Sequence, residues 1–177
     1  IRDLVRSRGL GDVYKRQLEY SAMAQFNTKE EFMEGNLFDF IEEYAMNILN
    51  RSDRLKVQVV RSDTEGIEMK FVPQNIAIIL DNVVSNSTKY NANELRVLLG
   101  KDEKQYTIDF IDDGDGVSSD IADLNELFEF GKGYTLTGTG VGLYHIKDIV
   151  EKDLQGTVTI ESEPQKGFAL HVRFGKV

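Results

Sequence analysis

The sequence predicts an α/β (α+β) fold: a two-layer sandwich with a mixed, largely antiparallel sheet covered on one face by about three helices. Apolar residues recur at helical spacing in three stretches, alternating stretches lie between them, and the chain closes with alternating segments at 157–160 and 168–174. With 177 residues and 41% hydrophobic side chains, the chain can build one core and hardly two. We therefore expect one main domain.

Composition excludes several kinds of function. The formal net charge is −9, from 21 basic and 30 acidic residues, and nothing resembles a basic face for nucleic acid. The lack of cysteine excludes disulfides, thiolate metal sites and a cysteine nucleophile. No apolar run approaches the roughly 18 residues of a membrane helix, and no secretory segment is evident. We expect no membrane contact by this segment and a cytoplasmic location, with an anchor in a longer parent protein left open.

Residues 1–17 differ in charge from the rest of the chain. They carry five basic and two acidic residues, whereas the remainder carries 16 and 28. Because SRGLGDVYKRQ resembles a translated sequencing adapter, we interpret residues 1–17 as a non-native or disordered segment; a genuine basic arm is the alternative. Residues 18–35 are interpreted as the tail of an upstream helical domain, and residues 36–177 as the main domain.

The elements follow in order from residue 37. Apolar residues in 37–48 repeat at helical spacing and predict a first helix. The stretches 55–59 and 67–71 alternate on either side of a turn at 63–66 and predict a β-hairpin. Pro73 suits the first turn of a second helix, where a missing N–H costs nothing. The core stripe of that helix consists of Ile76, Ile79, Leu80, Val83 and Val84.

Polar residues edge the apolar stripe of this second helix. Asn75, Asn82, Asn86 and Lys89 lie at offsets of 0, 7, 11 and 14, close to one line along the helix. Tyr90 falls between that flank and the core, where its ring can cover a flat ligand. Asparagine is a mediocre helix former, so two of them one turn apart indicate a site more than a solvated helix side, which is the alternative.

The strand predicted at 106–112 ends in a carboxylate. Tyr106, Ile108 and Phe110 alternate, so Asp112 keeps the parity of the apolar face and should point inward. A buried carboxylate needs donors, which an exocyclic amine and an ordered water would supply. The glycines at 114 and 116 permit a close approach of the backbone to a ligand; an ordinary Asp-Gly turn is the alternative.

A glycine-rich turn leads into the third helix. Residues 137–142 read TGTGVG, and the core stripe that follows is Leu143, Ile146, Ile149 and Val150. Such a turn offers free backbone N–H groups and a positive helix end to phosphates. No Gly-Lys-Ser/Thr follows, which excludes a Walker loop, and no hydrophobic strand leads into the turn, which argues against a dinucleotide site.

In this order, the stretches resemble the N, G1, F and G2 boxes of the GHKL superfamily, the ATPases named for gyrase, heat-shock chaperones, histidine kinases and mismatch-repair proteins. The boxes are residues 82–90, 112–116, 127–130 and 138–143, and the likeness covers about residues 36–174. The resemblance implies a Bergerat-type ATP-binding fold. It is most like the HATPase_c catalytic domain of sensor histidine kinases, which would make 36–177 a histidine kinase-like ATP-binding domain.

The resemblance also implies roles for residues. Asn86 would hold Mg²⁺ through its side-chain oxygen, and Asp112 would accept a hydrogen bond from the amino group of adenine. Phe128 would anchor a lid formed by residues 117–137. The implied catalytic residues are Asn82 and Lys89, and the implied nucleotide-binding residues are Asn82, Asn86, Lys89, Tyr90, Asp112, Gly114, Gly116, Phe128, Lys132, Thr137, Gly138, Thr139, Gly140, Val141, Gly142 and Leu143.

Asn82 separates subfamilies. Members that hydrolyse ATP, such as gyrase, carry glutamate there to activate water; asparagine cannot act as that base, and Asp81 points about 100° away around the helix. The resemblance therefore favours a histidine kinase that binds ATP·Mg and transfers the γ-phosphate to a histidine on a domain not in this chain. The implied partners are that phosphoacceptor domain, a response regulator and, in the full-length protein, a second copy in a homodimer.

Two departures and two alternatives accompany this interpretation. The first departure is minor: Ser87 follows Asn86 where alanine is common. The second is that the F box of the family continues into Pro-Phe and often a basic residue, whereas Gly131 and Lys132 follow Phe130 here, with Lys132 as the candidate substitute for the basic residue. His145 and His171 are expected to be structural. The alternatives are an ATPase of the same superfamily that performs conformational work, and a nucleotide-binding module without catalysis.

Overall fold

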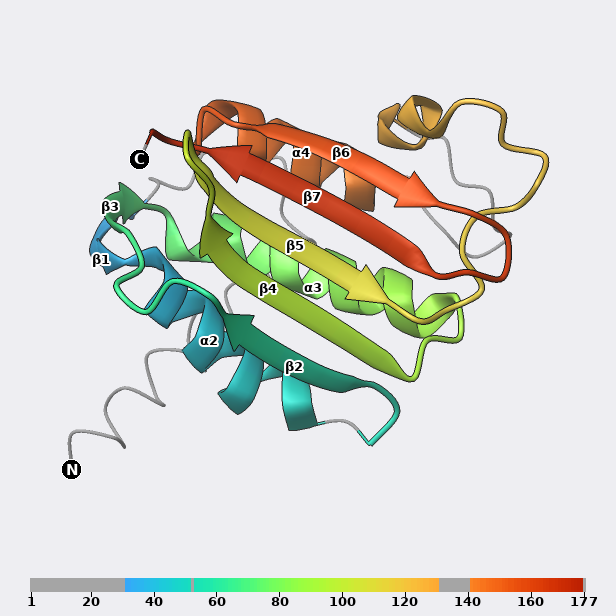
Figure 1. The fold of residues 1–177 in the computed structure, drawn as a ribbon, viewed down its shortest axis with the longest axis horizontal. Helices are drawn as coiled ribbons and strands as arrows, with labels where there is room; N and C mark the ends of the chain where they lie inside the picture. Colours follow the sequence, from blue (N-terminus) through green and yellow to red (C-terminus); the bar gives the residue numbers. More distant parts are fainter. Residues whose placement is uncertain (1–30, 52, 131–140, 177) are drawn as a thin grey trace.

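The computed structural model of the chain describes residues 31–51, 53–130 and 141–176. In that part, a five-stranded sheet forms one layer and three helices form the other (Figure 1). The helices are α2 (Leu37–Asn47), α3 (Pro73–Lys89) and α4 (Gly142–Lys152), with two short 3-10 helices, η1 (Leu49–Arg51) and η2 (Leu124–Phe128). The predicted two-layer sandwich is confirmed.

The main sheet is mixed. Its strands are β2 (Lys56–Arg61), β4 (Glu94–Lys101), β5 (Tyr106–Asp112), β6 (Thr157–Ser162) and β7 (Phe168–Phe174). Their order is β2-β4-β5-β7-β6; β2 runs parallel to β4, and the other neighbours are antiparallel. The closing hairpin predicted from the sequence is confirmed as β6 and β7.

The hairpin predicted from residues 55–59 and 67–71 is wrong. Both stretches contain strands, but β3 (Glu68–Phe71) pairs with β1 (Met33–Asn36) in a separate two-stranded antiparallel sheet, while β2 joins the main sheet. The backbone N–H of Ser62 donates to the carbonyl of Leu99, which extends the pairing of β2 with β4 instead of turning back. Alternation identifies the two faces of a strand but not its partner, which is a distant segment here.

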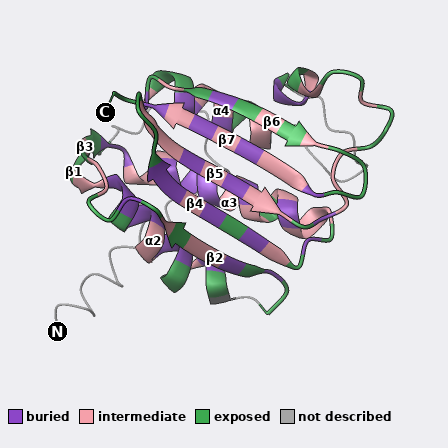
Figure 2. Cartoon of the chain, viewed as in Figure 1, coloured by how far each residue is buried: buried purple, intermediate pink, exposed green. Residues whose placement is uncertain are grey.

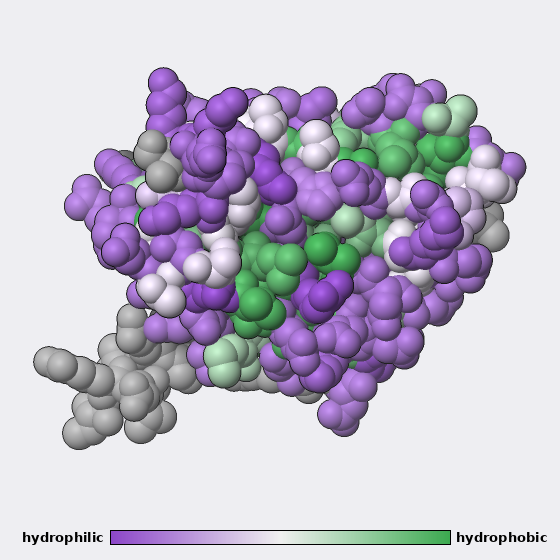
Figure 3. Space-filling view, viewed as in Figure 1, coloured by the Kyte–Doolittle hydropathy of each residue, from purple (hydrophilic) through white to green (hydrophobic). Residues whose placement is uncertain are grey.

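The core lies between the sheet and the helices. Figure 2 shows buried residues alternating along the central strands. On the outer face, which carries no helix among the described residues, Figure 3 shows an apolar area near the middle, with polar side chains around it. Val60, on the outer side of β2, is 50% exposed. None of the helices in the described ranges combines the length and the apolar character that a bilayer crossing requires.

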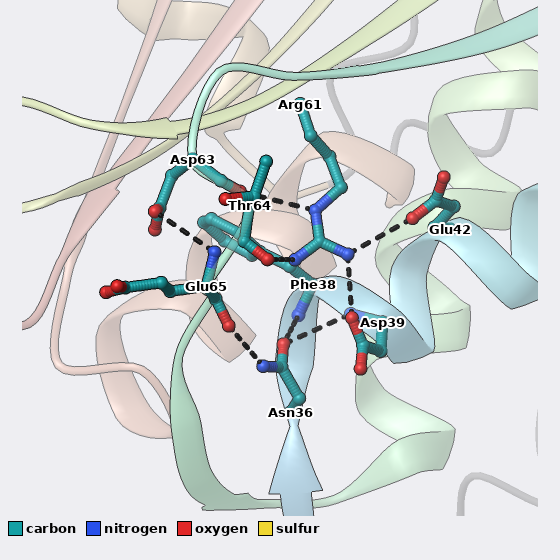
Figure 4. Close-up of polar contacts among 8 residues, drawn as sticks. All are labelled: Asn36, Phe38, Asp39, Glu42, Arg61, Asp63, Thr64 and Glu65. Carbon is teal, nitrogen blue, oxygen red and sulfur yellow. Dashed lines mark hydrogen bonds and ion pairs between the residues drawn. The ribbon is translucent and has the colours of Figure 1, made fainter.

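Arg61, at the end of β2, ties the first turn of α2 to the turn after β2 (Figure 4). Its Nη1 lies 2.7 Å from Asp39 Oδ1 and 3.2 Å from Glu42 Oε2. Its Nε and Nη2 donate to the carbonyls of Asp63 and Thr64 at 3.3 and 3.2 Å. Hydrogen bonding to Asp39, followed by that to Glu42, raises the pKa of Arg61. Through these contacts, Arg61 holds the end of β2, the turn that follows it and α2 together.

Replacing Arg61 with methionine should lower the free energy of unfolding by about 2 kcal/mol, because the turn carbonyls and two carboxylates lose their common donor. The side chain of Arg61 is only 15% exposed, so water replaces these contacts poorly. Urea unfolding measures the change. Arg96→Met, at an exposed position on the neighbouring strand β4, is the matched control. An equal loss in both variants would contradict the role assigned to Arg61.

Candidate functional site

The candidate site lies at the opposite end of the sheet from Arg61. Asp112 at the end of β5 pairs with Leu95 near the start of β4, whereas Arg61 pairs with Leu99 near the end of β4. The second half of α3 and the start of α4 supply the other site residues. Pro73 occupies the first turn of α3, as predicted, and α3 then runs unbroken through Asn82 and Asn86 to Lys89.

Two residues of the polar flank of α3, Asn75 and Asn82, lie against α4. Near one end of the contact, Asn75 Nδ2 donates to Asp153 Oδ2 at 2.5 Å. At the other end, Asn82 lies against the first residue of α4, since a Cβ added to Gly142 would lie 2.9 Å from Asn82 Oδ1. The amide of Asn82 is held by donation of its Nδ2 to the carbonyl of Ile78 at 2.9 Å. The two helices therefore approach closely where the glycine-rich turn enters α4.

Asp81 points away from this flank, as predicted. The hydroxyl of Tyr44, a fully buried residue of α2, donates to both carboxylate oxygens of Asp81, at 3.0 and 3.1 Å. Asp81 is thus engaged between α2 and α3, and Asn82 faces α4. The neighbouring carboxylate of Asp81 is not directed at the start of α4.

Asp112 points into the helix layer, which confirms the parity argument. Its Oδ2 accepts a hydrogen bond from Ser87 Oγ at 2.7 Å, and its Oδ1 accepts from the backbone N–H of Gly114 at 2.9 Å. Ser87 is 1% exposed and Asp112 is partly exposed. The carboxylate therefore accepts one hydrogen bond on each oxygen from the described residues and remains partly exposed.

Backbone contacts join the loop after β5 to the end of α3. The backbone N–H of Asp115 donates to the carbonyl of Tyr90 at 2.8 Å. Asp113 Oδ1 accepts from the backbone N–H groups of Asn93 and Glu94 at 2.8 and 2.9 Å. These bonds, that of Glu94 first, lower the pKa of Asp113. The loop and the α3 terminus consequently form one unit.

Tyr90 caps α3 beside this unit. Its ring is half-buried, and burial raises the pKa of its phenol. Lys89 Nζ lies 5.8 Å from the centre of the Tyr90 ring, a cation–π distance. Tyr90 and Lys89 thus lie together at one side of the site.

Gly116, with φ +69°, turns the loop toward the β6–β7 turn, where a Cβ added to this glycine would overlap the carbonyl of Glu163.

Among the described residues, no side chain caps the start of α4. Val141 is its N-cap residue and Gly142 its first residue. Unsatisfied N–H groups and the helix dipole make such an end suitable for an anion. Leu143 packs partly buried against the core. The expected contacts at Thr137, Gly138, Thr139, Gly140 and Lys132 lie outside the described residues.

Phe128 lies at the end of η2 and is 4% exposed within the core. Lys147 Nζ of α4 lies 5.5 Å from the centre of its ring. Next to it, Phe130 is largely exposed and packs edge-to-face on Tyr144 of α4, with ring centres 5.2 Å apart. Phe128 therefore anchors the segment after β5 to α4.

Asn86 is the residue that the family resemblance assigns to a metal ion, through its side-chain oxygen. Among the described residues, no group of three or more His, Cys, Asp or Glu side chains is arranged to hold a metal ion. A hard oxygen donor of this kind suits Mg²⁺, which usually takes few protein ligands and keeps phosphate and water oxygens. The chemistry of this one oxygen donor is thus compatible with a magnesium ion held jointly with phosphates.

The two histidines lie elsewhere. His145 is exposed on α4. His171 is on the outer side of β7, where its Nδ1 lies 2.7 Å from Asp109 Oδ1.

The site residue that sequence reasoning missed is Ser87. Its signal was its place on the core stripe of α3, at four and seven residues from Val83 and Leu80 along the same face.

The chain matches a known protein family. A family model described as histidine kinase-, DNA gyrase B- and HSP90-like ATPase matches residues 71–176. The sensor protein kinase PilS of Pseudomonas aeruginosa is 26% identical over 176 residues, which cover 96% of this chain and 32% of PilS. The chain thus spans about a third of the length of that curated relative.

Solved structures share the fold. The catalytic domain of the histidine kinase ThkA aligns with a TM-score of 0.66 at 18% identity, covering 82% of this chain and 96% of that one. The ATP binding domain of PrrB from Mycobacterium tuberculosis aligns with a TM-score of 0.62 at 19% identity, covering 82% and 98%. The Acinetobacter baumannii histidine kinase AdeS aligns with a TM-score of 0.60 at 15% identity, covering 90% and 74%.

Proposed function

Because the chain belongs to the family of histidine kinase-, DNA gyrase B- and HSP90-like ATPases, we propose that it binds ATP with Mg²⁺ and is the catalytic domain of a histidine kinase. The observation that carries the binding is the inward carboxylate of Asp112, which is partly exposed and accepts one hydrogen bond from α3 and one from the loop after β5. The 6-amino group of adenine is a donor that such a carboxylate can accept.

The polar groups are proposed to divide the nucleotide between them. Asp112 and Tyr90 take the base, and the uncapped start of α4 takes the phosphates at the end where Asn82 lies. Asn86 would hold Mg²⁺, which offsets phosphate charge when bound. Lys89 adds a positive charge on the same flank of α3.

Transfer is favoured over hydrolysis because, among the described residues, α3 directs no base at the proposed phosphate end. Asn82 is an amide held by the carbonyl of Ile78, and the nearby carboxylate of Asp81 is engaged by Tyr44. Neither group is available to deprotonate a water there. We propose that the γ-phosphate passes to a histidine of a separate phosphoacceptor domain and then to a response regulator, in a homodimeric, cytoplasmic signalling protein.

Titration of the 177-residue chain with ATP, with and without Mg²⁺, tests the nucleotide site. We expect Mg²⁺ to strengthen ATP binding to the wild type by about tenfold and to have little effect on Asn86→Ala, because one metal ligand is lost. Asn47→Ala, at the exposed end of α2, is the control and should behave as wild type. A chain that binds no ATP would be a structural module, and the proposal would fail.

A phosphate-release assay on the same chain distinguishes kinase from ATPase. The proposal expects bound ATP to persist without sustained release of inorganic phosphate. Sustained hydrolysis by this domain alone, abolished by Asn82→Ala, would instead support an ATPase that performs conformational work.

A further inference from the structure

We propose that Ser87 is a positioning residue that makes the site selective for a 6-amino purine, an inference that rests on the proposed nucleotide site. Ser87 follows Asn86 on α3, one residue along from the polar flank and on the core side. The sequence suggested a minor change at this position. In the folded chain, its hydroxyl is committed to the carboxylate of Asp112, which lies 25 residues away.

The hydroxyl of Ser87 has a defined direction. At 1% exposure it has almost no contact with water, and its Oγ lies 2.7 Å from Asp112 Oδ2. A carboxylate oxygen only accepts, so the hydroxyl proton points to Asp112 and the lone pairs of Oγ point elsewhere. Gly114 donates its backbone N–H to the other oxygen at 2.9 Å. Donors from two different elements thus hold the plane of the carboxylate.

This arrangement presents acceptors alone to a base. The free lone pairs of Asp112 suit the hydrogens of an exocyclic amine, as in adenine. They oppose the 6-carbonyl of guanine, which is itself an acceptor. A carboxylate free to rotate could instead take the adjacent N1–H and N2–H donors of guanine with both oxygens. By engaging Oδ2, Ser87 disfavours that pairing.

Binding of three nucleotides to wild type and Ser87→Ala tests the inference. The probes are ATP, GTP and purine riboside 5′-triphosphate, which lacks the 6-amine. We expect Ser87→Ala to weaken ATP about tenfold, since one charge-assisted hydrogen bond no longer orients Asp112. GTP and purine riboside triphosphate should bind the variant no more weakly than they bind wild type, so the preference for ATP over GTP falls by about the same factor.

Ser85→Ala, an exposed position on the same helix, controls for the change in helix propensity and should alter none of the three affinities. If Ser87→Ala weakens all three nucleotides equally, or leaves ATP unchanged, Ser87 is only a tie between α3 and β5 and the inference is overturned. Asp112→Ala separates this failure from that of the proposed function. A wild-type chain that binds no ATP rejects both, whereas loss of ATP in Asp112→Ala with normal binding in Ser87→Ala rejects only the role of Ser87.

Discussion

Replacing Asp112 with alanine is expected to weaken ATP binding about a hundredfold, because the base loses its only charged acceptor in the described part of the site. The backbone N–H of Gly114 and the hydroxyl of Ser87 also lose their shared partner, at 2.9 and 2.7 Å in the structure. Fluorescence titration with an ATP analogue labelled on the ribose measures the affinity without altering the base.

Asp109→Ala is the matched control for this experiment. Asp109 lies on the same strand but on the outer face, where it contacts His171 and Arg173 at 2.7 and 2.6 Å. This variant should lose some stability and keep its affinity for ATP. Equal affinities of the Asp112 and Asp109 variants would show that the base binds elsewhere, and the site assigned to Asp112 would be abandoned.

Replacing Gly114 with alanine should lower the free energy of unfolding by about 3 kcal/mol, because the new methyl group overpacks a closed contact. A Cβ at this position would lie 2.7 Å from the carbonyl of Tyr90 and 3.2 Å from Asp112 Oδ1. The Tyr90 carbonyl cannot retreat without breaking its bond to the backbone N–H of Asp115. Calorimetry should show a fall in Tm on the order of 10 °C.

Gly35→Ala is the control for this substitution. Gly35 lies in β1, its φ is not positive, and the nearest atom to an added Cβ is Met33 Cε at 3.9 Å. With space available, alanine should leave stability unchanged or raise it by up to about 1 kcal/mol, because it restricts the unfolded chain. The role given to Gly114 is wrong if its alanine variant unfolds at the same temperature as Gly35→Ala.

Local patterns in the sequence predicted most of the elements correctly. Helical spacing and Pro73 located α3, and strand alternation placed Asp112 on the inward face of β5. The angular offset along α3 also separated Asp81 from Asn82, and the structure directs these residues to Tyr44 and to Gly142 respectively. Each of these predictions depends on backbone periods of 3.6 or 2 residues, which act over a few neighbours.

Strand partners were harder to predict. The stretches that form β2 and β3 are adjacent in the chain and both alternate, so a hairpin was the simplest pairing. In the folded chain, β2 pairs with β4 and β3 with β1. Arg61 holds the intervening turn against α2, which directs the chain away from β2. A long-range ion pair of this kind leaves no periodic signal.

The sequence by itself determined the three helices, the strands that end the chain and the one that ends at Asp112, the inward direction of Asp112 and the family resemblance, because these depend on spacing along one segment. Only the tertiary structure decided that Ser87 bonds to Asp112 across 25 residues, and that Arg61 bonds to Asp39 across 22. Both bonds join separate elements, and their partners are chosen by how the helices pack on the sheet. The physical reason is that periodicity specifies which face a side chain occupies, whereas packing specifies which side chain it meets.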